Sequence, residues 1–274
     1  MYDIAVIGGG PAGLSAAIQV RARNKSVLVV SGDDRDNPLY KTSRIDNYLG
    51  FYNVTGPELL ERFRTHAGQM GAERRDGRVL NLLAVGGAYY LSIGSEVEQA
   101  RAVVLATGVV RAKKYPGEAE RLGAGVSYCA TCDGMLYRGK PVAVVGYTDT
   151  ARQEAEFLQK IGCSVTYFDR PKQCEIRGDG RVESVTCDGR TIPAEGVFIL
   201  RPTMAPTELF PGLAVEQGYV TVDRRMATNL PGLFAAGDCT GGPLQVSKAA
   251  GDGLIAGQSA AAWAAAQERR EKQS

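Results

Sequence analysis

A glycine-rich turn close to the amino terminus constrains the fold of this chain more than any other feature. An uncharged run at residues 4–7 has the character of a short strand, and a helical pattern begins at Leu14. The turn between them consists of Gly8, Gly9, Gly10, Pro11, Ala12 and Gly13. A strand, a glycine turn and a helix in this order let backbone N–H groups and the positive helix end receive a pyrophosphate. An ordinary tight turn would not explain three glycines in GxGxxG register, so the pattern predicts a dinucleotide site in a parallel α/β sheet.

The sequence after this turn continues the same unit. Residues 27–30 are apolar and supply a second strand, and Asp33 and Asp34 follow it. An acid about 20 residues beyond the glycine fingerprint is where a ribose hydroxyl is bound in such sites. We therefore expect Asp33 to belong to the cofactor site.

A second strand, turn and helix lie in the middle of the chain. Residues 141–146 form an uncharged run that ends in glycine, residues 151–161 have a helical pattern, and residues 164–168 return to strand character. The turn between the first strand and the helix has Thr148 where the middle glycine of GxGxxG would stand, and Tyr147 precedes it. At 274 residues the chain is long enough for two domains, and the repeated pattern predicts two Rossmann-like βαβ domains of the α/β class.

Covalent chemistry is most plainly available at residues 128–134, which read Tyr-Cys-Ala-Thr-Cys-Asp-Gly. Two cysteines separated by two residues can close a small disulfide, and one thiol of such a motif often has a lowered pKa. Asp133 directly follows Cys132 and could carry the proton that accompanies thiol and disulfide exchange. We therefore take Cys129, Cys132 and Asp133 as the candidate catalytic residues.

A structural zinc site is the alternative reading of this motif. Zinc needs four ligands, but the chain has no second CxxC, and its single histidine, His66, lies far away in sequence. The remaining four cysteines are scattered singly, at Cys163, Cys174, Cys187 and Cys239. We therefore expect no metal. We expect these cysteines to be thiols, with Cys163 and Cys187 as small buried side chains and Cys239 as a packing residue.

Charge and hydropathy exclude several classes of partner. The formal net charge is +2, and basic and acidic residues alternate along most of the chain, which is not the basic stripe of a nucleic-acid binder. No uncharged apolar stretch approaches the roughly 20 residues that a spanning helix requires, and no basic segment precedes the first strand. We expect a cytoplasmic protein that binds neither nucleic acid nor membrane.

Other segments complete the outline. Pro57 opens a helix, Gly86 and Gly87 indicate a hairpin, and an alanine-rich helix over residues 254–263 is expected to pack closely on another helix. Two further apolar strands end in glycine, at Ala106-Thr107-Gly108 and at Ala236-Gly237-Asp238.

These motifs together resemble the low-molecular-weight thioredoxin reductase family of flavoproteins over nearly the whole chain. The matching residues are Gly8 to Gly13, Asn47, Thr55 to Pro57, Ala106 to Gly108, Cys129 to Gly134, Gly237, Asp238 and Gln245. The resemblance implies a discontinuous FAD-binding domain, residues 1–112 and 232–274, and an inserted NADPH-like domain, residues 113–231, that carries the redox disulfide. It implies a homodimer that reduces a thioredoxin-like protein, with Cys132 facing the flavin and Cys129 attacking the partner's disulfide.

The same resemblance implies which residues hold FAD. They are Gly8, Gly10, Pro11, Ala12, Gly13, Asn47, Ala106, Thr107, Gly108, Gly237, Asp238, Gln245 and Val246, together with Asp33 from the ribose argument. Asp133 would be the proton donor.

The chain departs from the family pattern where NADPH would bind. Thr148 replaces the middle glycine, Asp169 stands where the 2′-phosphate would need positive charge, and Leu244 replaces the family's arginine before Gln245. Three changes in one pocket lead us to expect a donor other than NADPH. Related subfamilies accept electrons from ferredoxin or have an undefined donor, so we expect ferredoxin or another one-electron donor. A flavin can accept electrons singly and pass on a pair.

Three other functions stay open from the sequence. The chain could be an NADPH-dependent thioredoxin reductase with an atypical nucleotide pocket. It could run the electrons backwards as a thiol oxidase that forms disulfides and passes electrons to oxygen. It could also be a non-catalytic flavin-binding module in which the disulfide no longer turns over.

Overall fold

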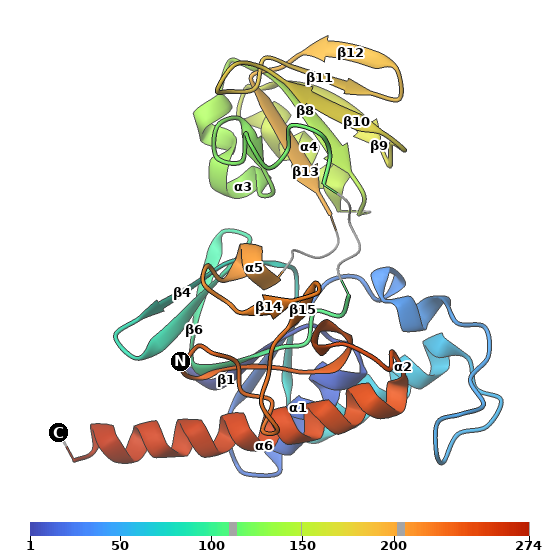
Figure 1. Cartoon of the computed structure of the whole chain (residues 1–274), viewed down its shortest axis with the longest axis vertical. Helices are drawn as coiled ribbons and strands as arrows, with labels where there is room; N and C mark the ends of the chain where they lie inside the picture. Colours follow the sequence, from blue (N-terminus) through green and yellow to red (C-terminus); the bar gives the residue numbers. More distant parts are fainter. Residues whose placement is uncertain (110–113, 149, 202–205, 274) are drawn as a thin grey trace. The chain divides into compact units, whose positions relative to one another are not determined.

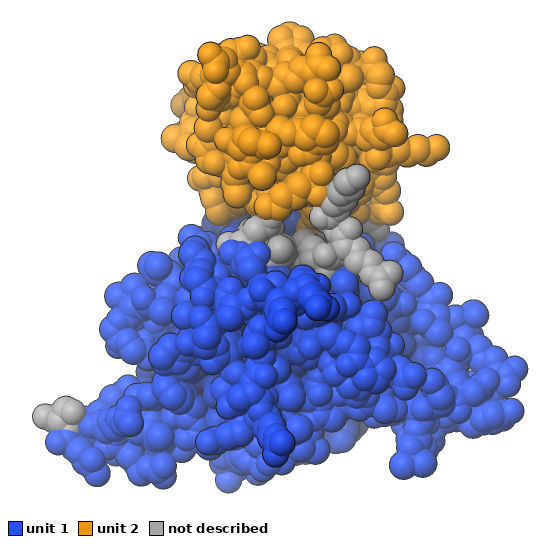
Figure 2. Space-filling view, viewed as in Figure 1, with its two compact units in different colours: residues 1–110, 203–274 blue, residues 111–202 orange. Residues whose placement is uncertain are grey.

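The chain folds into two compact units. The structure is a computed structural model that describes residues 1–109, 114–148, 150–201 and 206–273. Unit 1 comprises residues 1–110 and 203–274, and unit 2 comprises residues 111–202 (Figure 2).

Unit 1 is built on a mixed seven-stranded sheet, whose main path runs in the order β3-β2-β1-β6-β5-β4 while β16 also pairs with β6. Its strands are β1 (Tyr2–Ile7), β2 (Val27–Ser31), β3 (Glu73–Asp76), β4 (Val79–Val85), β5 (Ala88–Ile93), β6 (Glu96–Leu105) and β16 (Leu233–Ala235). Strands β1, β2, β3, β6 and β16 pair in parallel, whereas β4, β5 and β6 are antiparallel. The hairpin expected at Gly86 and Gly87 joins β4 to β5, and both glycines have positive φ. The carboxyl ends of the parallel strands therefore share one edge, where open α/β sheets bind ligands.

The helices of unit 1 are α1 (Pro11–Arg21), α2 (Gly56–Gln69), α6 (Val246–Glu271) and the short α5 (Pro206–Leu209). Helix α2 begins with the expected proline and a capping box in which Thr55 and Glu58 bond to each other's backbone N–H groups. Helix α6 lies along α1 (Figure 1), and a Cβ on Gly253 or Gly257 would clash with the backbone of Ala12 or Ala16. The close helix packing expected from the small residues of this segment is confirmed.

The sheet of unit 1 buries both faces. Ile4 and Val6 of β1 pack with α1 and α6, while Ala5 and Ile7 pack in a second cluster with β4, β5 and residues 209–220. Side chains alternate across a strand, so a run buried on both sides must be apolar throughout. This explains why residues 4–7 show no polar alternation.

Unit 2 holds the second βαβ unit. Its strands and helices are β7 (Val126–Ser127), α3 (Ala130–Asp133), β8 (Pro141–Gly146), α4 (Ala151–Lys160), β9 (Ser164–Asp169), β10 (Cys174–Arg177), β11 (Ser184–Cys187), β12 (Arg190–Pro193) and β13 (Gly196–Leu200). Strands β7, β13, β8 and β9 form a parallel four-stranded sheet, and β10, β11 and β12 form a separate antiparallel one (Figure 1). The expected α/β class with two Rossmann-like units is confirmed. The turn position Asp149 lies outside the described residues.

The return to the first unit occurs earlier than the sequence suggested. We expected the inserted domain to continue to residue 231, but residues 206–231 lie in unit 1. They include α5, β14 (Val215–Glu216) and β15 (Tyr219–Val220). The physical reason is a shared core, because Leu209, Leu213 and Val220 are buried with Tyr89 and Leu91 of the large sheet.

Candidate redox and cofactor sites

The expected redox pair is a disulfide at the start of a short helix in unit 2. Cys129 is the N-cap of α3, its Sγ accepts a hydrogen bond from the N–H of Cys132 at 3.0 Å, and the two Cα atoms lie 5.4 Å apart. The exposures of the two cysteines differ, since Cys129 is buried and Cys132 is exposed. Cys132 is therefore the half of the bond that is open to attack in this structure.

The acid beside the disulfide is held by a serine that the sequence analysis did not single out. Ser127, at the end of β7, is buried, and its hydroxyl donates to Asp133 Oδ2 at 2.7 Å. The same hydroxyl accepts from the N–H of Cys129 at 3.1 Å. Ser127 thus joins the carboxylate of Asp133 to the backbone of the first cysteine.

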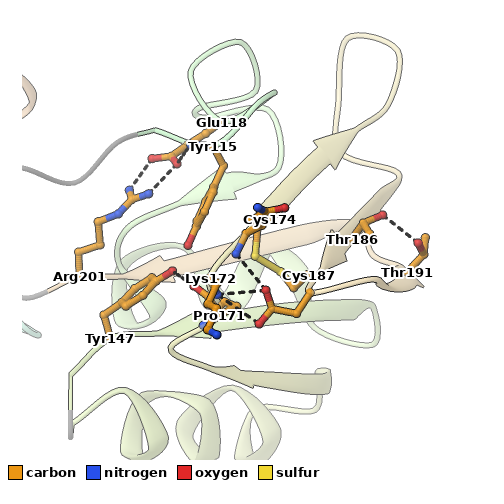
Figure 3. Close-up of a disulfide and its surroundings, with 12 residues drawn as sticks. Tyr115, Glu118, Tyr147, Pro171, Lys172, Cys174, Thr186, Cys187, Thr191 and Arg201 are labelled. Carbon is orange, nitrogen blue, oxygen red and sulfur yellow. Dashed lines mark hydrogen bonds and ion pairs between the residues drawn. A yellow bond between two sulfur atoms is a disulfide. The ribbon is translucent and has the colours of Figure 1, made fainter.

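A buried ion pair supports the segment that leads into this motif. Glu118 is fully buried, and it accepts two hydrogen bonds from the guanidinium of Arg201, at 2.5 and 2.8 Å (Figure 3). It accepts a third from the hydroxyl of Tyr128 at 2.9 Å. Burial lowers the pKa of Arg201, but the Glu118 carboxylate more than offsets it, so the pKa lies above its ordinary value. The ring of Tyr115 lies 5.3 Å from the guanidinium carbon. No sequence signal pointed to this pair, because its members are 83 residues apart.

The first glycine turn has the tight backbone contacts that a phosphate cradle requires. Gly8 follows β1 with φ +118°, and a Cβ there would clash with the carbonyl of Ala106. A Cβ on Gly13 would clash with the carbonyl of Gly8. Gly10 is the N-cap of α1 without a side-chain cap, and Pro11 occupies the first turn. The amino end of α1 is thus left open to an anionic group.

Two more of the expected cofactor segments meet this turn. Ala106, Thr107 and Gly108 follow β6, and Gly237 follows β16 with φ +83°, where a Cβ would overlap the Cβ of Ala12. Asp238 is the next residue. These segments gather at the carboxyl edge of the parallel strands, as the strand-end glycines predicted.

Helix α6 fixes the Gly237 turn through a charged pair. Asp252 accepts a hydrogen bond from the N–H of Gly237 at 3.1 Å, and Lys248 donates to the carbonyl of Gly237 at 2.8 Å. Lys248 also donates to Thr240 and to the carbonyl of Gly241, and it pairs with Asp252 at 2.8 Å. The sequence analysis missed both residues, although a lysine and an acid four positions apart on a helix are a recognisable pairing signal.

The other expected cofactor residues lie around this edge. Gln245 is the N-cap of α6, and Val246 begins the helix and packs against the cluster around Leu14 and Ile45. Asn47 is exposed in the loop between β2 and α2, and no contact places it within the cradle. Asp33 follows β2, but its carboxylate binds Arg35 at 2.6 Å, and this hydrogen bond lowers the pKa of Asp33 to about 2. Asp33 thus follows β2, as the sequence shows, and the charge of its carboxylate is already compensated by Arg35.

One further observation supports the fit between FAD and the residues of the cradle. The Thr107 hydroxyl is buried, and among the described residues it has no hydrogen-bond partner. A buried polar atom without a partner is costly, and a bound polar ligand is one way to satisfy it. Together with the glycines that cannot carry a Cβ, the Thr107 hydroxyl gives this edge the character of a polar ligand site.

The second glycine turn, in unit 2, has aromatic side chains next to it. A Cβ on Gly146 would clash with the hydroxyl of Tyr167, and the Tyr147 hydroxyl donates to the carbonyl of Pro171 at 2.8 Å (Figure 3). Thr148 is buried, and Asp169 at the end of β9 is exposed, with its carboxylate 3.4 Å from Arg152. The turn thus has aromatic side chains around it and an acid at the neighbouring strand end.

One sequence expectation about the cysteines was wrong. Cys174 and Cys187 form a second disulfide instead of two separate thiols, because β10 and β11 place them directly opposite each other. Cys163 and Cys239 are free and buried, as expected.

Two further properties of the described residues concern membranes and metal ions. None of the helices in the described ranges is long and apolar enough to cross a membrane. The described part of the chain has no group of three or more His, Cys, Asp and Glu side chains that could hold a metal ion.

Comparison with known proteins assigns the chain to a class of enzyme. The family described as pyridine nucleotide-disulphide oxidoreductase matches residues 2–175 and 170–253. The chain therefore belongs to this family, and membership supports the expectation of FAD as the cofactor. Within the family it is a thioredoxin reductase-type disulfide oxidoreductase, so the resemblance found in the sequence is confirmed and the reading as a non-catalytic module is set aside.

Several relatives share nearly the whole length. A thioredoxin reductase of Listeria innocua is 34% identical over 296 residues, which cover 95% of this chain and 93% of that protein. The crystal structure of a ferredoxin-flavin thioredoxin reductase from Clostridium acetobutylicum is 39% identical with a TM-score of 0.90, covering 98% of this chain and 99% of the other. A thioredoxin reductase structure from Gloeobacter violaceus is 30% identical with a TM-score of 0.83, covering 97% and 95%.

Proposed function

We propose that this FAD-dependent enzyme takes electrons from a ferredoxin and uses them to reduce the Cys129–Cys132 disulfide, which then reduces a thioredoxin-like protein. The observation that carries the choice of donor is the contrast between the two glycine turns. The turn at Gly8 has the tight backbone contacts of a phosphate cradle and leads into a helix without a side-chain cap, while the turn at Gly146 is bordered by Tyr147 and Tyr167. The similarity to a ferredoxin-flavin thioredoxin reductase points the same way.

The FAD site would use the cradle of unit 1. The amino end of α1 and the backbone of Gly8, Gly10 and Gly13 would receive the pyrophosphate, and Thr107 and Asp238 would satisfy polar groups of the cofactor. Asp33, Asn47 and Gln245 remain proposed contacts. When bound, FAD supplies the conversion of single electrons into a pair.

The chemistry of the disulfide follows from the residues around it. Two electrons and two protons convert the Cys129–Cys132 bond into two thiols. Asp133 lies next to Cys132 and can give a proton to, or take one from, the departing sulfur, while Ser127 keeps one of its oxygens in place. One thiolate then attacks the partner's disulfide, and the other resolves the mixed disulfide, so the partner gains two thiols and this chain regains its disulfide. Because Cys129 is buried, we expect the thiolate of Cys129 to need a local movement before it attacks.

An exposed apolar pair beside the disulfide supports a protein as the electron acceptor. Met135 is 58% exposed and Leu136 is 70% exposed, and both lie only a few residues beyond Cys132. Exposed large apolar side chains next to a reactive group are typical of a docking surface. A small soluble disulfide would gain little from them, so the pair favours a folded thioredoxin-like substrate.

The test is an anaerobic titration of the yellow holoenzyme with reduced ferredoxin, NADPH and NADH in parallel. We expect the flavin absorbance to bleach with reduced ferredoxin and to stay unchanged with either nicotinamide cofactor. Prompt bleaching by NADPH would overturn the donor and favour the atypical NADPH-dependent reductase. Hydrogen peroxide formed on addition of dithiols in air, without ferredoxin, would favour the thiol oxidase.

The homodimer implied by the family resemblance is also part of the proposal. Sedimentation equilibrium of the holoenzyme should give twice the mass of the chain, and a concentration-independent monomer would contradict it.

A further inference from the structure

A second disulfide joins two neighbouring strands of unit 2. Cys174 is the first residue of β10 and Cys187 the last residue of β11, and they are direct partners in the antiparallel ladder with their Cα atoms 4.2 Å apart (Figure 3). Opposed residues at such a closely spaced position bring their Cβ atoms together. The bond therefore follows from the register of the hairpin and clips its open end.

The two disulfides of unit 2 differ in access. Cys132 of the first disulfide is exposed, whereas Cys174 and Cys187 are 5% and 1% exposed. A thiolate must reach a sulfur atom to exchange with it, so the second bond is protected while the hairpin is closed. Its reduction requires that β10 and β11 first separate.

Such a separation involves a small part of the fold. Each of β10, β11 and β12 has four residues, and the three form a sheet separate from the parallel sheet of unit 2. Local opening of a small sheet exposes less buried surface than unfolding of the whole domain, and it therefore needs less free energy. The free cysteine Cys163 lies in that core, packed with Leu158 and Phe198.

The residue after Cys187 ties the disulfide to a loop. Asp188 has φ +47°, and its carboxylate accepts hydrogen bonds from the N–H groups of Lys172, at 3.1 and 3.2 Å, and Gln173, at 3.0 Å. Its own N–H donates to the carbonyl of Gln173 at 3.0 Å. Asp188 thus caps the segment just before Cys174, and the disulfide holds the cap in place.

The capped loop borders the second glycine turn. The N–H of Arg170 donates to the carbonyl of Gly146 at 2.8 Å, and the carbonyl of Pro171 accepts from Tyr147 at 2.8 Å. Residues 170–173 are therefore fastened to the turn on one side and to Asp188 and the disulfide on the other. Among the contacts that hold residues 170–173, the disulfide is the covalent one.

We propose that Cys174–Cys187 is a second redox site, which locks residues 170–173 against the Gly146 turn while oxidised and frees them when a protein dithiol reduces it. In the reaction one thiolate of the dithiol attacks a sulfur of the opened hairpin to form a mixed disulfide, and the second thiolate resolves it. Two electrons and two protons pass to Cys174 and Cys187, and the dithiol becomes a disulfide. An oxidised protein disulfide of the same kind reverses the reaction. The lock is independent of the electron donor proposed above, since any protein dithiol supplies these electrons.

The first test follows the state of each cysteine in the native holoenzyme. The protein is equilibrated with reduced thioredoxin or with graded mixtures of reduced and oxidised dithiothreitol, then alkylated and analysed by mass spectrometry. We expect Cys174 and Cys187 to be labelled together while the buried thiols Cys163 and Cys239 stay unlabelled. If Cys174 and Cys187 stay unlabelled, or are labelled only when Cys163 and Cys239 react as well, the bond is a static staple and the proposal fails.

The second test measures the loop by hydrogen exchange. The N–H groups of Lys172 and Gln173 are held by Asp188 at the open end of the hairpin that the disulfide closes. Without the disulfide this end opens more easily, so we expect the amides of Lys172 and Gln173 to exchange about 10 to 100 times faster in the reduced protein and in C174A/C187A. Asp188→Gly keeps the left-handed backbone, removes the cap and should free the same amides with the disulfide intact. Thr186→Val breaks the side-chain contact with Thr191 in the same sheet, 2.8 Å in length, and should leave the loop protected. Unchanged exchange in reduced protein and in C174A/C187A would show that the disulfide does not hold the loop.

Discussion

The hydroxyl of Ser127 donates a 2.7 Å hydrogen bond to Asp133 and accepts one from the N–H of Cys129. A buried hydroxyl thus links the acid that follows the second redox cysteine to the backbone of the first. The bond engages Oδ2 of Asp133 and leaves Oδ1 outside this contact. Ser127 is in this sense a positioning residue for the proton transfer that we propose.

We expect Ser127→Ala to slow reduction of the thioredoxin-like partner by about tenfold, since hydrogen bonds to charged groups are worth roughly 1.5–3 kcal/mol. Asp133→Asn should cost more, about 100-fold, because general acid–base catalysis commonly contributes at least that much. Stopped-flow measurement of the reduction of the partner's disulfide gives both rates. Thermal unfolding checks that each variant is folded. If Ser127 acts through Asp133, the double variant should be no slower than Asp133→Asn alone, and additive losses would contradict the positioning role.

The glycine motifs were predictable because they record local constraints. Gly8, Gly13 and Gly237 stand where a Cβ would meet backbone or a packed helix, and that requirement is written into the residue type itself. The expected helix at Pro57 and the hairpin at Gly86 were equally local. The glycine segments that follow β1, β6 and β16 meet at one edge of the sheet because these strands run in parallel.

What the sequence did not reveal depends on pairings between distant residues. Cys174 meets Cys187 only through the register of β10 and β11, and Glu118 meets Arg201 across 83 residues. The boundary at residue 231 was wrong for the same reason, because Leu209 and Leu213 join a core formed by strands far earlier in the chain. The residue types alone give little indication of such contacts, because the contacts depend on how the folded chain brings distant residues together.

The phosphate cradle can be tested with two glycines of opposite surroundings. Gly13→Ala places a Cβ against the carbonyl of Gly8, while Gly32→Ala points into open space with nothing within 4 Å. We expect Gly13→Ala to weaken FAD binding at least about tenfold, or ~1.4 kcal/mol, and Gly32→Ala to retain it. The ratio of flavin to protein absorbance after dilution and filtration measures retention. Equal retention in the two variants would remove the Gly8–Gly13 turn from the cofactor site.

The exposed apolar pair beside the disulfide predicts a selective loss of partner binding. Leu136 is 70% exposed, so Leu136→Glu should leave the fold intact. We expect KM for the thioredoxin-like protein to rise about tenfold, as a lost apolar contact of ~1.4 kcal/mol would give. The rate with a small aromatic disulfide reagent should not change, because such a reagent needs no docking surface. A fall in both rates together would assign Leu136 to the redox centre instead.

We expect a large loss in the free energy of unfolding when one member of the buried ion pair in unit 2 is removed. Glu118→Gln leaves the Arg201 guanidinium, whose side chain is 13% exposed, without its carboxylate. Removing one member of a buried pair typically costs about 3–5 kcal/mol, and we expect a loss of this order in the free energy of unfolding. The exposed pair of Glu175 and Arg177 provides the matched control, and Glu175→Gln should change stability little. Urea unfolding of both variants compares them, and equal small losses would mean that the Glu118 pair is not desolvated as described.

The buried thiol next to Asp238 predicts a pH dependence of stability. Burial raises the pKa of Cys239 from its ordinary value of 9.0 to about 11. The folded state therefore holds the proton more tightly than the unfolded state, so this contribution to stability is fully present below pH 9 and is lost as the pH rises toward 11. We expect the difference in unfolding free energy between the wild type and Cys239→Ala to be constant below pH 9 and to shrink above it. Urea unfolding of the holoenzyme across this range measures the difference. A difference that stays constant up to pH 11 would mean that the thiol titrates alike in the folded and unfolded states.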